Sequence, residues 1–244
     1  MTPPRSAMVL AAGLGTRMRP LTDTTAKPLL EVAGRSLLHR ILDHLAMAGV
    51  RRVVVNTHWQ REAVLAALAE RSDLEILESR EETLLDTGGA VAKALPLLGD
   101  GPFYIVNGDS LWLDGARPAL RRLADAFDPD RLDAVLLVHR AAVLPSYTGR
   151  GDFAVDPWGR LRRPREREIV PYLFAGVQIA SPSLFAESPK GAFSANLLWD
   201  RAIAAERLRA VVHDGVWLHL STPEDMATAE DVVRGYASAF AHAR

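Results

Sequence analysis

The sequence predicts an α/β protein of three layers, with helices on both faces of a mostly parallel, Rossmann-like central sheet. Two observations predict this fold class. From residue 7 to residue 139, short apolar runs alternate with longer stretches of helical spacing, which is typical of repeated β-α units. The short runs are also apolar at nearly every position, as expected of strands that are buried on both sides.

The expected elements follow in chain order. The short apolar runs predict strands at residues 7–12, 52–56, 74–77, 103–106 and 133–139. The amphipathic stretches between them predict helices at residues 36–48, 60–70, 89–98 and 116–126. Ser36 is placed to cap the first of these helices, and Gly49 is placed to end it.

The pattern changes after residue 139, where Pro, Gly and Arg become frequent. There we expect two short strands, at 151–155 and 172–180, and two helices, at 195–206 and 223–241. No linker separates the two parts, so the sequence predicts one domain, residues 1–244, whose second part builds a wall of the substrate site.

Composition excludes several functional classes. The chain has 244 residues, and its net charge of −1 gives no overall footprint for nucleic acid. It has no cysteine, which excludes disulfides, thiolate zinc sites, iron–sulfur clusters and a cysteine nucleophile. No apolar run approaches the ~20 residues that span a bilayer, and no secretory signal is seen at the start. We therefore expect a cytoplasmic protein with neither nucleic acid nor membrane as a partner.

A glycine-rich loop after the first strand carries the strongest functional signal. In the run Leu10-Ala-Ala-Gly-Leu-Gly-Thr-Arg-Met-Arg-Pro-Leu-Thr22, two close glycines let backbone amides approach an anion. Arg17 and Lys27 add positive charge at the carboxyl end of the strand, where open α/β sheets bind their ligands. The predicted polyphosphate cradle consists of Ala11, Ala12, Gly13, Gly15, Thr16, Arg17 and Lys27. The run is neither a Walker A loop nor a dinucleotide fingerprint, which disfavours a kinase or a nicotinamide dehydrogenase.

This loop resembles the N-terminal signature of the sugar-1-phosphate nucleotidyltransferases. The stretches KPLLEVAGRSLL, LLDTGGAVAKALPLLGDGPFYIVNGDS, GRGDF and LFAGVQI extend the resemblance over nearly the whole chain. It implies the nucleotide-diphospho-sugar transferase fold, in which residues 1–140 bind the nucleotide and residues 141–244 bind the sugar. Within the family, this short chain is similar to the uridylyltransferases that couple N-acetylmuramic acid 1-phosphate to UTP in cell-wall recycling.

The run Thr87-Gly88-Gly89 precedes a predicted helix. On its own it fits a helix cap with a tight turn. The resemblance assigns Thr87, Gly88 and Gly89 to the nucleobase pocket, where backbone groups read the edge of the base. The choice of uracil also comes from the resemblance, since these residues select a pocket and not a base.

Asn107 and Asp109 follow the strand predicted at 103–106. A carboxylate at the end of a buried strand is costly unless it is paired or holds a metal, although Asn-Gly-Asp alone is also a common turn. Mg²⁺ binds one or two carboxylates together with phosphate oxygens and waters. The resemblance implies that Asp109 is a metal ligand and that Asn107 contacts the sugar phosphate.

The C-terminal part departs from the family, which usually has a second metal carboxylate in a Trp-x-Asp-x-Gly-Thr run. Here His219 and Ser221 stand at the Asp and Gly positions. The preferred interpretation is Mg²⁺ on Asp109 alone. The others are a softer ion, Mn²⁺, Co²⁺ or Zn²⁺, with His219 as a weak ligand, a hydrogen bond from His219 to a phosphate, or a core histidine.

On the sugar side, Asp152 and Gly176 resemble sugar-contacting positions of the family. Relatives often carry Glu-Lys-Pro where this chain has the run Leu161-Arg-Arg-Pro164. Arg162 or Arg163 is a candidate for a phosphate contact, or for contact with the lactyl carboxylate of muramic acid. Any single arginine of such a segment is more often solvated.

The predicted reaction is an in-line displacement, in which a sugar 1-phosphate attacks the α-phosphorus of a nucleoside triphosphate and pyrophosphate leaves. Arg17, Lys27 and Asp109 are the expected catalytic residues. Alternatives of the same chemistry are a mannose- or glucose-1-phosphate nucleotidyltransferase and a phosphocholine cytidylyltransferase. An alternative of another class is a non-catalytic module that binds nucleotide sugars. We expect a monomer or a small homo-oligomer.

Overall fold

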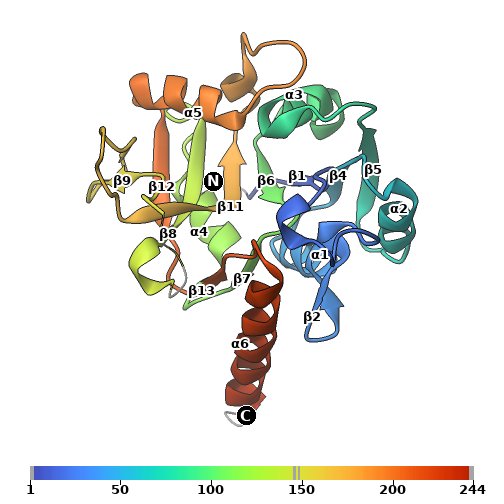
Figure 1. Ribbon diagram of the computed structural model, residues 1–244. Helices are drawn as coiled ribbons and strands as arrows, with labels where there is room; N and C mark the ends of the chain where they lie inside the picture. The colour runs from blue at the N-terminus through green and yellow to red at the C-terminus, as the bar shows by residue number, and fades with distance from the viewer. Residues whose placement is uncertain (1–2, 145–146, 148, 242–244) are drawn as a thin grey trace.

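The computed structural model describes residues 3–144, 147 and 149–241, and it confirms the predicted fold class. A seven-stranded sheet in the order β12-β8-β11-β6-β1-β4-β5 has helices on both faces (Figure 1). Its strands are β1 (Ser6–Leu10), β4 (Arg52–Thr57), β5 (Glu75–Arg80), β6 (Phe103–Asn107), β8 (Ala134–Arg140), β11 (Tyr172–Ala180) and β12 (Leu208–Val212). The helices are α1 (Leu37–Met47), α2 (Arg61–Ala69), α3 (Asp86–Leu98), α4 (Ala119–Ala126), α5 (Ala195–Ala204) and α6 (Pro223–Ala241). Short two-stranded sheets pair β2 (Glu31–Val32) with β3 (Arg35–Ser36), β7 (Leu111–Leu113) with β13 (Val216–Leu218), and β9 (Ala154–Val155) with β10 (Leu161–Arg162).

Strands β5, β4, β1 and β6 are parallel neighbours. The chain moves outward from β1 to β4 and β5, and then returns through α3 to β6 on the other side of β1. The strand order therefore reverses at β1, and ligands bind at such a switch point, outside the carboxyl ends of the strands. Leu10 at the end of β1 is level with Asn56 on β4 and with Asn107 on β6, so two polar side chains flank the loop that follows β1.

Alternate residues of a strand face opposite helix layers. On β1, Ala7 and Val9 pack in a core with α1, α2 and α4, whereas Met8 packs in a second core with α3 and α5. This period of two explains the continuous apolar runs, because both faces of each central strand are buried.

The second half of the chain extends the same sheet. Strand β11 runs antiparallel to both of its neighbours, β6 and β8, and β12 is parallel to β8. The pairing of β11 with β8 is interrupted between Phe174 and Gln178, where Gly176 has a φ of +75°. Strands from both halves thus share one sheet, while the assignment of nucleotide and sugar to residues 1–140 and 141–244 stays a prediction.

Several boundaries differ from the predicted ones. Helix α3 begins at Asp86, three residues before the predicted start. The amide of Gly88, in its first turn, has no partner within the helix and donates instead to the carbonyl of Phe193 (2.9 Å). Helix α4 begins at Ala119, whose amide donates to Asp114 Oδ1 (2.8 Å). The strand expected at 151–155 is reduced to Ala154–Val155.

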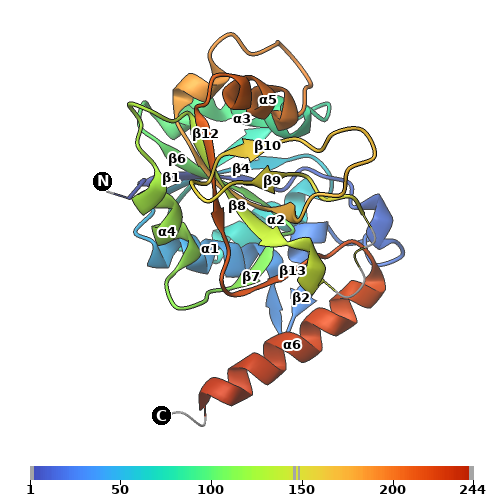
Figure 2. The same cartoon turned by 90° about the vertical axis from the view of Figure 1, so that its left-hand side faces the viewer.

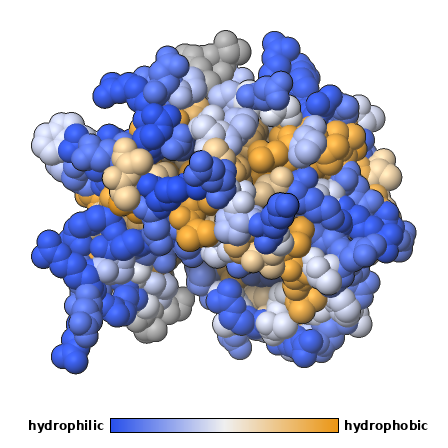
Figure 3. All heavy atoms as spheres, turned by 90° about the horizontal axis from the view of Figure 1, so that it is seen from above, coloured by the Kyte–Doolittle hydropathy of each residue, from blue (hydrophilic) through white to orange (hydrophobic). Residues whose placement is uncertain are grey.

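Helix α6 projects away from the sheet, as Figures 1 and 2 show. Ala229 and Val233 pack it against a small third core that includes Val32 and Leu220, and Glu230 accepts a hydrogen bond from the amide of Ala33. In the described part of the chain, no helix combines the length and the apolar character that a membrane crossing needs. Seen from above, the surface is mainly hydrophilic with smaller apolar areas between polar side chains (Figure 3).

Candidate functional site

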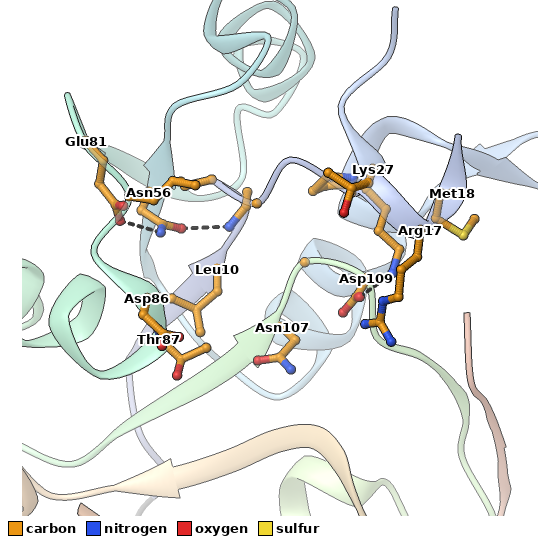
Figure 4. Close-up of a pocket in the computed structure, with 18 residues that line it drawn as sticks. Leu10, Arg17, Met18, Lys27, Asn56, Glu81, Asp86, Thr87, Asn107 and Asp109 are labelled. Atoms are coloured by element: carbon orange, nitrogen blue, oxygen red, sulfur yellow. Dashed lines mark hydrogen bonds and ion pairs between the residues drawn. The ribbon is translucent and has the colours of Figure 1, made fainter. Parts of the chain in front are cut away.

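A cavity of about 520 Å³ opens at the carboxyl ends of β1, β4 and β6 (Figure 4). It lies at the topological switch point, and most of the residues that the sequence singles out surround it. The predicted residues that line it are Ala11, Ala12, Gly13, Gly15, Thr16, Arg17, Lys27, Thr87, Asn107 and Asp109. The structure therefore gathers the glycine loop, the two cations and the carboxylate around one space.

The loop after β1 is held in a tight turn by Gly15. Its φ is +62°, and a Cβ at this position would lie 2.9 Å from Thr22 Cγ2, so a larger residue does not fit. The carbonyl of Gly15 accepts hydrogen bonds from the Met18 amide (2.8 Å) and from the Thr22 hydroxyl (2.8 Å). This turn starts the 3-10 helix Thr16–Met18, which brings Arg17 to the cavity.

Lys27, Asp109 and Arg17 form the charged end of the cavity. Lys27 is 8% exposed, and its Nζ donates to Asp109 Oδ2 (2.5 Å) and to the carbonyl of Leu220 (2.6 Å). These bonds satisfy a buried ammonium group and fix the carboxylate beside it. Arg17 is exposed and makes no hydrogen bond or ion pair with any described residue, so its guanidinium is available for an anion. Figure 4 shows the three side chains close together at one end of the pocket.

At the other end of the cavity lies a buried polar network that the sequence analysis does not identify. Asn56 Oδ1 accepts from the Ala11 amide (2.7 Å), and Asn56 Nδ2 donates to Glu81 Oε1 (2.7 Å). Glu81 Oε2 accepts from the Leu85 amide (2.9 Å). Asn56 and Glu81 are almost fully buried and both line the cavity. Asn56 is the last residue of a predicted strand, which is a sequence signal for it, whereas Glu81 lies beyond the strand predicted at 74–77 and has no such signal.

A second cavity of about 260 Å³ adjoins the first. The two share the lining residues Leu10, Asp86, Thr87 and Asn107. Asp152, predicted to contact a sugar, lines this second cavity, and its Oδ2 accepts from the Phe174 amide (2.9 Å). Gln178 and Trp199, which the sequence analysis does not identify, also line it. One continuous site thus runs from the charged end, past Asn107, to the wall formed by β11 and α5.

Three predicted glycines lie beside this site rather than in its lining. The amides of Gly88 and Gly89 both donate to the carbonyl of Phe193, at 2.9 and 3.1 Å. In this structure they are therefore engaged, and a role in reading a base stays a prediction. Gly176 lets β11 approach β6, since a Cβ there would lie 2.1 Å from Ser110 Oγ and 3.3 Å from Asn107 Cβ. The lack of a side chain at Gly176 thus leaves room for Ser110 and Asn107, and a contact of Gly176 with a sugar stays a prediction.

His219 lies outside the lining of both cavities. It is exposed, which argues against a core histidine, and its Nε2 is 2.8 Å from Ser221 Oγ. The neighbouring Leu220 carbonyl is the one that accepts from Lys27. The C-terminal segment therefore reaches the site through its backbone.

The donor set limits how a divalent ion can be held. Among the described residues, no three His, Asp or Glu side chains are grouped as a metal site. One oxygen of Asp109 accepts a hydrogen bond from Lys27, and its other oxygen has no hydrogen bond or ion pair with a described residue. One carboxylate oxygen without a hydrogen-bond partner in the lining of the larger cavity fits Mg²⁺, which obtains its other ligands from phosphates and water.

Comparisons with known proteins identify the family of this chain. The model of the nucleotidyl transferase family matches residues 6–141. The chain is 38% identical over 232 residues to N-acetylmuramate alpha-1-phosphate uridylyltransferase of Caulobacter vibrioides, covering 93% of this chain and 96% of that protein. It is 38% identical to the protein of the same name from Neisseria meningitidis serogroup B, over 88% of this chain and 93% of that one.

Solved structures agree at the level of the fold. A UDP-glucose pyrophosphorylase complexed with UDP-glucose superposes with a TM-score of 0.81 at 16% identity, over 96% of this chain and 99% of that chain. A putative glucose-1-phosphate thymidylyltransferase from Bacillus anthracis superposes with a TM-score of 0.79 at 15% identity, over 94% of this chain and 95% of that chain.

Proposed function

Because the chain belongs to the nucleotidyl transferase family, we propose that it couples N-acetylmuramic acid 1-phosphate to UTP and releases pyrophosphate. The observation that carries this proposal is the pair of joined cavities, one ending in Arg17, Lys27 and Asp109 and the other walled by β11 and α5. The uridylyltransferases that share 38% identity over most of this chain support the choice of both substrates. A cytoplasmic location is part of the proposal, because the cell makes UTP there.

The triphosphate lies along the loop after β1 in this proposal. The loop offers backbone amides and a turn fixed by Gly15, and the free guanidinium of Arg17 faces the same space. Arg17 is placed to stabilise the β- and γ-phosphates as they become pyrophosphate. The base then lies toward Asn56 and Glu81, whose network holds the Ala11 amide and the start of α3 in place.

The two reacting groups meet where the cavities join. Both are anions, so the protein must mainly neutralise charge and align the attacking oxygen. Lys27 supplies a buried, fixed ammonium group at the charged end of the larger cavity, and Asn107 lines both cavities and supplies an amide for the sugar phosphate. No side-chain nucleophile is needed, because the sugar phosphate itself attacks.

Asp109 is the residue that would hold Mg²⁺ in this proposal. When bound, such an ion acts as a Lewis acid and as a template for phosphate oxygens. Lys27 donates a hydrogen bond to one oxygen of Asp109, and this bond fixes the orientation of the carboxylate and so of its other oxygen. His219 is not needed as a ligand, since it does not line either cavity.

Pyrophosphate release from a matrix of substrates tests the proposal. Four nucleoside triphosphates are each combined with the 1-phosphates of N-acetylmuramic acid, N-acetylglucosamine, mannose and glucose, and with phosphocholine, in Mg²⁺ and in Mn²⁺. The expected result is the highest kcat/KM for UTP with N-acetylmuramic acid 1-phosphate. A preference for GTP with mannose 1-phosphate or for CTP with phosphocholine contradicts it, and binding without turnover indicates a non-catalytic module.

A further inference from the structure

The smaller cavity has a single cation among its described lining residues, the guanidinium of Arg163. The other charged residues that line it are Asp86 and Asp152. The neighbouring Arg162 points elsewhere, because it forms two hydrogen bonds with Glu168, at 2.7 and 2.6 Å, and lines neither cavity. The structure thus separates two adjacent arginines that the sequence alone leaves equivalent.

Arg163 is held in one orientation by three contacts. Its Nε donates to Asp200 Oδ1 (2.7 Å), and its Nη2 donates to Asn196 Oδ1 (2.7 Å). The guanidinium carbon lies 4.5 Å from the centroid of the ring of Phe153, which is fully buried. A guanidinium has five N–H groups, so three remain for a ligand. A planar, fixed guanidinium with free N–H groups matches the geometry of a carboxylate or a phosphate.

Gln178 supplies a second unused donor on the same wall. The side chain is 3% exposed on β11, and the Trp199 indole donates to its Oε1 (3.0 Å). This bond orients the amide, and its NH₂ group donates to no described residue. Gln178 lines the smaller cavity, so this NH₂ group can donate to a ligand oxygen that enters it.

Arg163 lies apart from the other cations of the site. Lys27 and Arg17 line only the larger cavity, Asn107 lines both cavities, and Arg163 lines only the smaller one. A sugar phosphate that reacts where the cavities join therefore has its own cations. An anion at Arg163 must be a second one, carried by the body of the sugar.

We propose that Arg163 binds a carboxylate of the sugar 1-phosphate and thereby selects a carboxylated amino sugar over the same sugar without that group. The inference rests on the proposed function, since N-acetylmuramic acid is N-acetylglucosamine with a lactyl ether that bears a carboxylate. Asp200, Asn196 and Phe153 act as positioning residues for the guanidinium. Gln178 donates to another oxygen of the same sugar.

Paired kinetics with the two sugars test this. For the wild type, Arg163→Gln and Arg163→Lys, kcat/KM is measured with UTP and either N-acetylmuramic acid 1-phosphate or N-acetylglucosamine 1-phosphate. Arg163→Gln is expected to lower kcat/KM for the muramic substrate about 10–100-fold, the usual loss for a hydrogen bond to a charged group, and to leave the glucosamine substrate nearly unchanged. Arg163→Lys is expected to recover part of the loss, and Arg162→Gln serves as the matched control.

The ratio of the two kcat/KM values is independent of the amount of correctly folded enzyme, so a partly unfolded variant still gives a result. An equal loss on both sugars overturns the inference, because it indicates contact with the shared phosphate or a structural role. If the wild type prefers the muramic substrate and Arg163→Gln keeps the same preference, the inference is overturned, while the proposed function stands. A wild type that favours the glucosamine substrate contradicts both together.

Discussion

At the scale of single residues, a substitution of Arg17 tests the rate without changing stability, whereas a substitution of Lys27 changes both. Lys27 satisfies Asp109 and the Leu220 carbonyl, so its removal affects both stability and rate. Arg17 is exposed and has no partner among the described residues, so its removal should leave the fold intact. The loss of one preorganised charge typically costs about 10²–10³ in rate.

Arg17→Ala is therefore expected to lower kcat for pyrophosphate release by about 10²–10³, with no change in the midpoint of thermal unfolding. Arg19→Ala is the matched control. Arg19 lies two residues away, pairs with Asp23 at 3.2 Å and does not line the cavity. Equal rates for Arg17→Ala and the wild type would remove Arg17 from the mechanism.

The sequence could locate the charged end of the site because its residues follow strands in short, recognisable runs. Gly15, Arg17 and Lys27 stand in one window, and Asp109 follows the next strand beside β1. The sequence could not reveal the pairs formed across the fold. Glu81 becomes informative only once Asn56 on the neighbouring strand donates to it, since a lone glutamate after a strand is ordinarily a solvated surface residue.

At the scale of elements, the sequence predicts best where a local signal decides. Ser36 was predicted to cap α1, and its Oγ accepts from the His39 amide (3.2 Å). Gly49 was predicted to end the helix, and its φ is +87°. Strand β12 was not predicted, because it lies at the sheet edge and only Leu208 of its residues is buried. Its pairing with β8 comes from tertiary contacts, which local periodicity does not record.

The cap at Ser36 gives a prediction for stability without a change in activity. Ser36→Ala removes the side-chain acceptor for the His39 amide and is expected to lower the free energy of unfolding by about 0.5–2 kcal/mol. Urea denaturation measures the change, and kcat/KM should stay within twofold of the wild type because Ser36 lines neither cavity. Ser72→Ala, at an exposed position, is the control and should have no effect on stability. If Ser36→Ala leaves the free energy of unfolding unchanged, water replaces the side-chain acceptor at the start of the helix.

At the scale of the whole molecule, the described second half adds a buried pair of histidines between β8, β12 and β13. His139 and His213 are 6% and 5% exposed, with ring centroids 6.0 Å apart, and Trp217 lies 5.7 Å from His139. Burial lowers the pKa of His139, and the nearby His213 lowers it further. Burial also lowers the pKa of His213, although its bonds to the Val216 and Leu113 carbonyls and the charges of Asp114 and Asp214 oppose this.

These lowered pKa values predict that stability falls as the pH drops below about 6.5. In that range the unfolded chain binds protons at both histidines while the folded chain resists them, so the free energy of unfolding falls by up to about 1.4 kcal/mol per pH unit for each group. The carboxylates with lowered pKa values, such as Asp43, add to the loss only near pH 4 and below.

Urea denaturation at pH 8.0, 6.5 and 5.5 measures the effect of pH on the free energy of unfolding. His139→Gln should flatten the decline between pH 6.5 and 5.5, whereas His219→Gln, at an exposed histidine, should follow the wild type. If the stability of the wild type is constant over this range, the folded and unfolded chains bind protons equally, and the pKa values of the two histidines are not lowered in the fold.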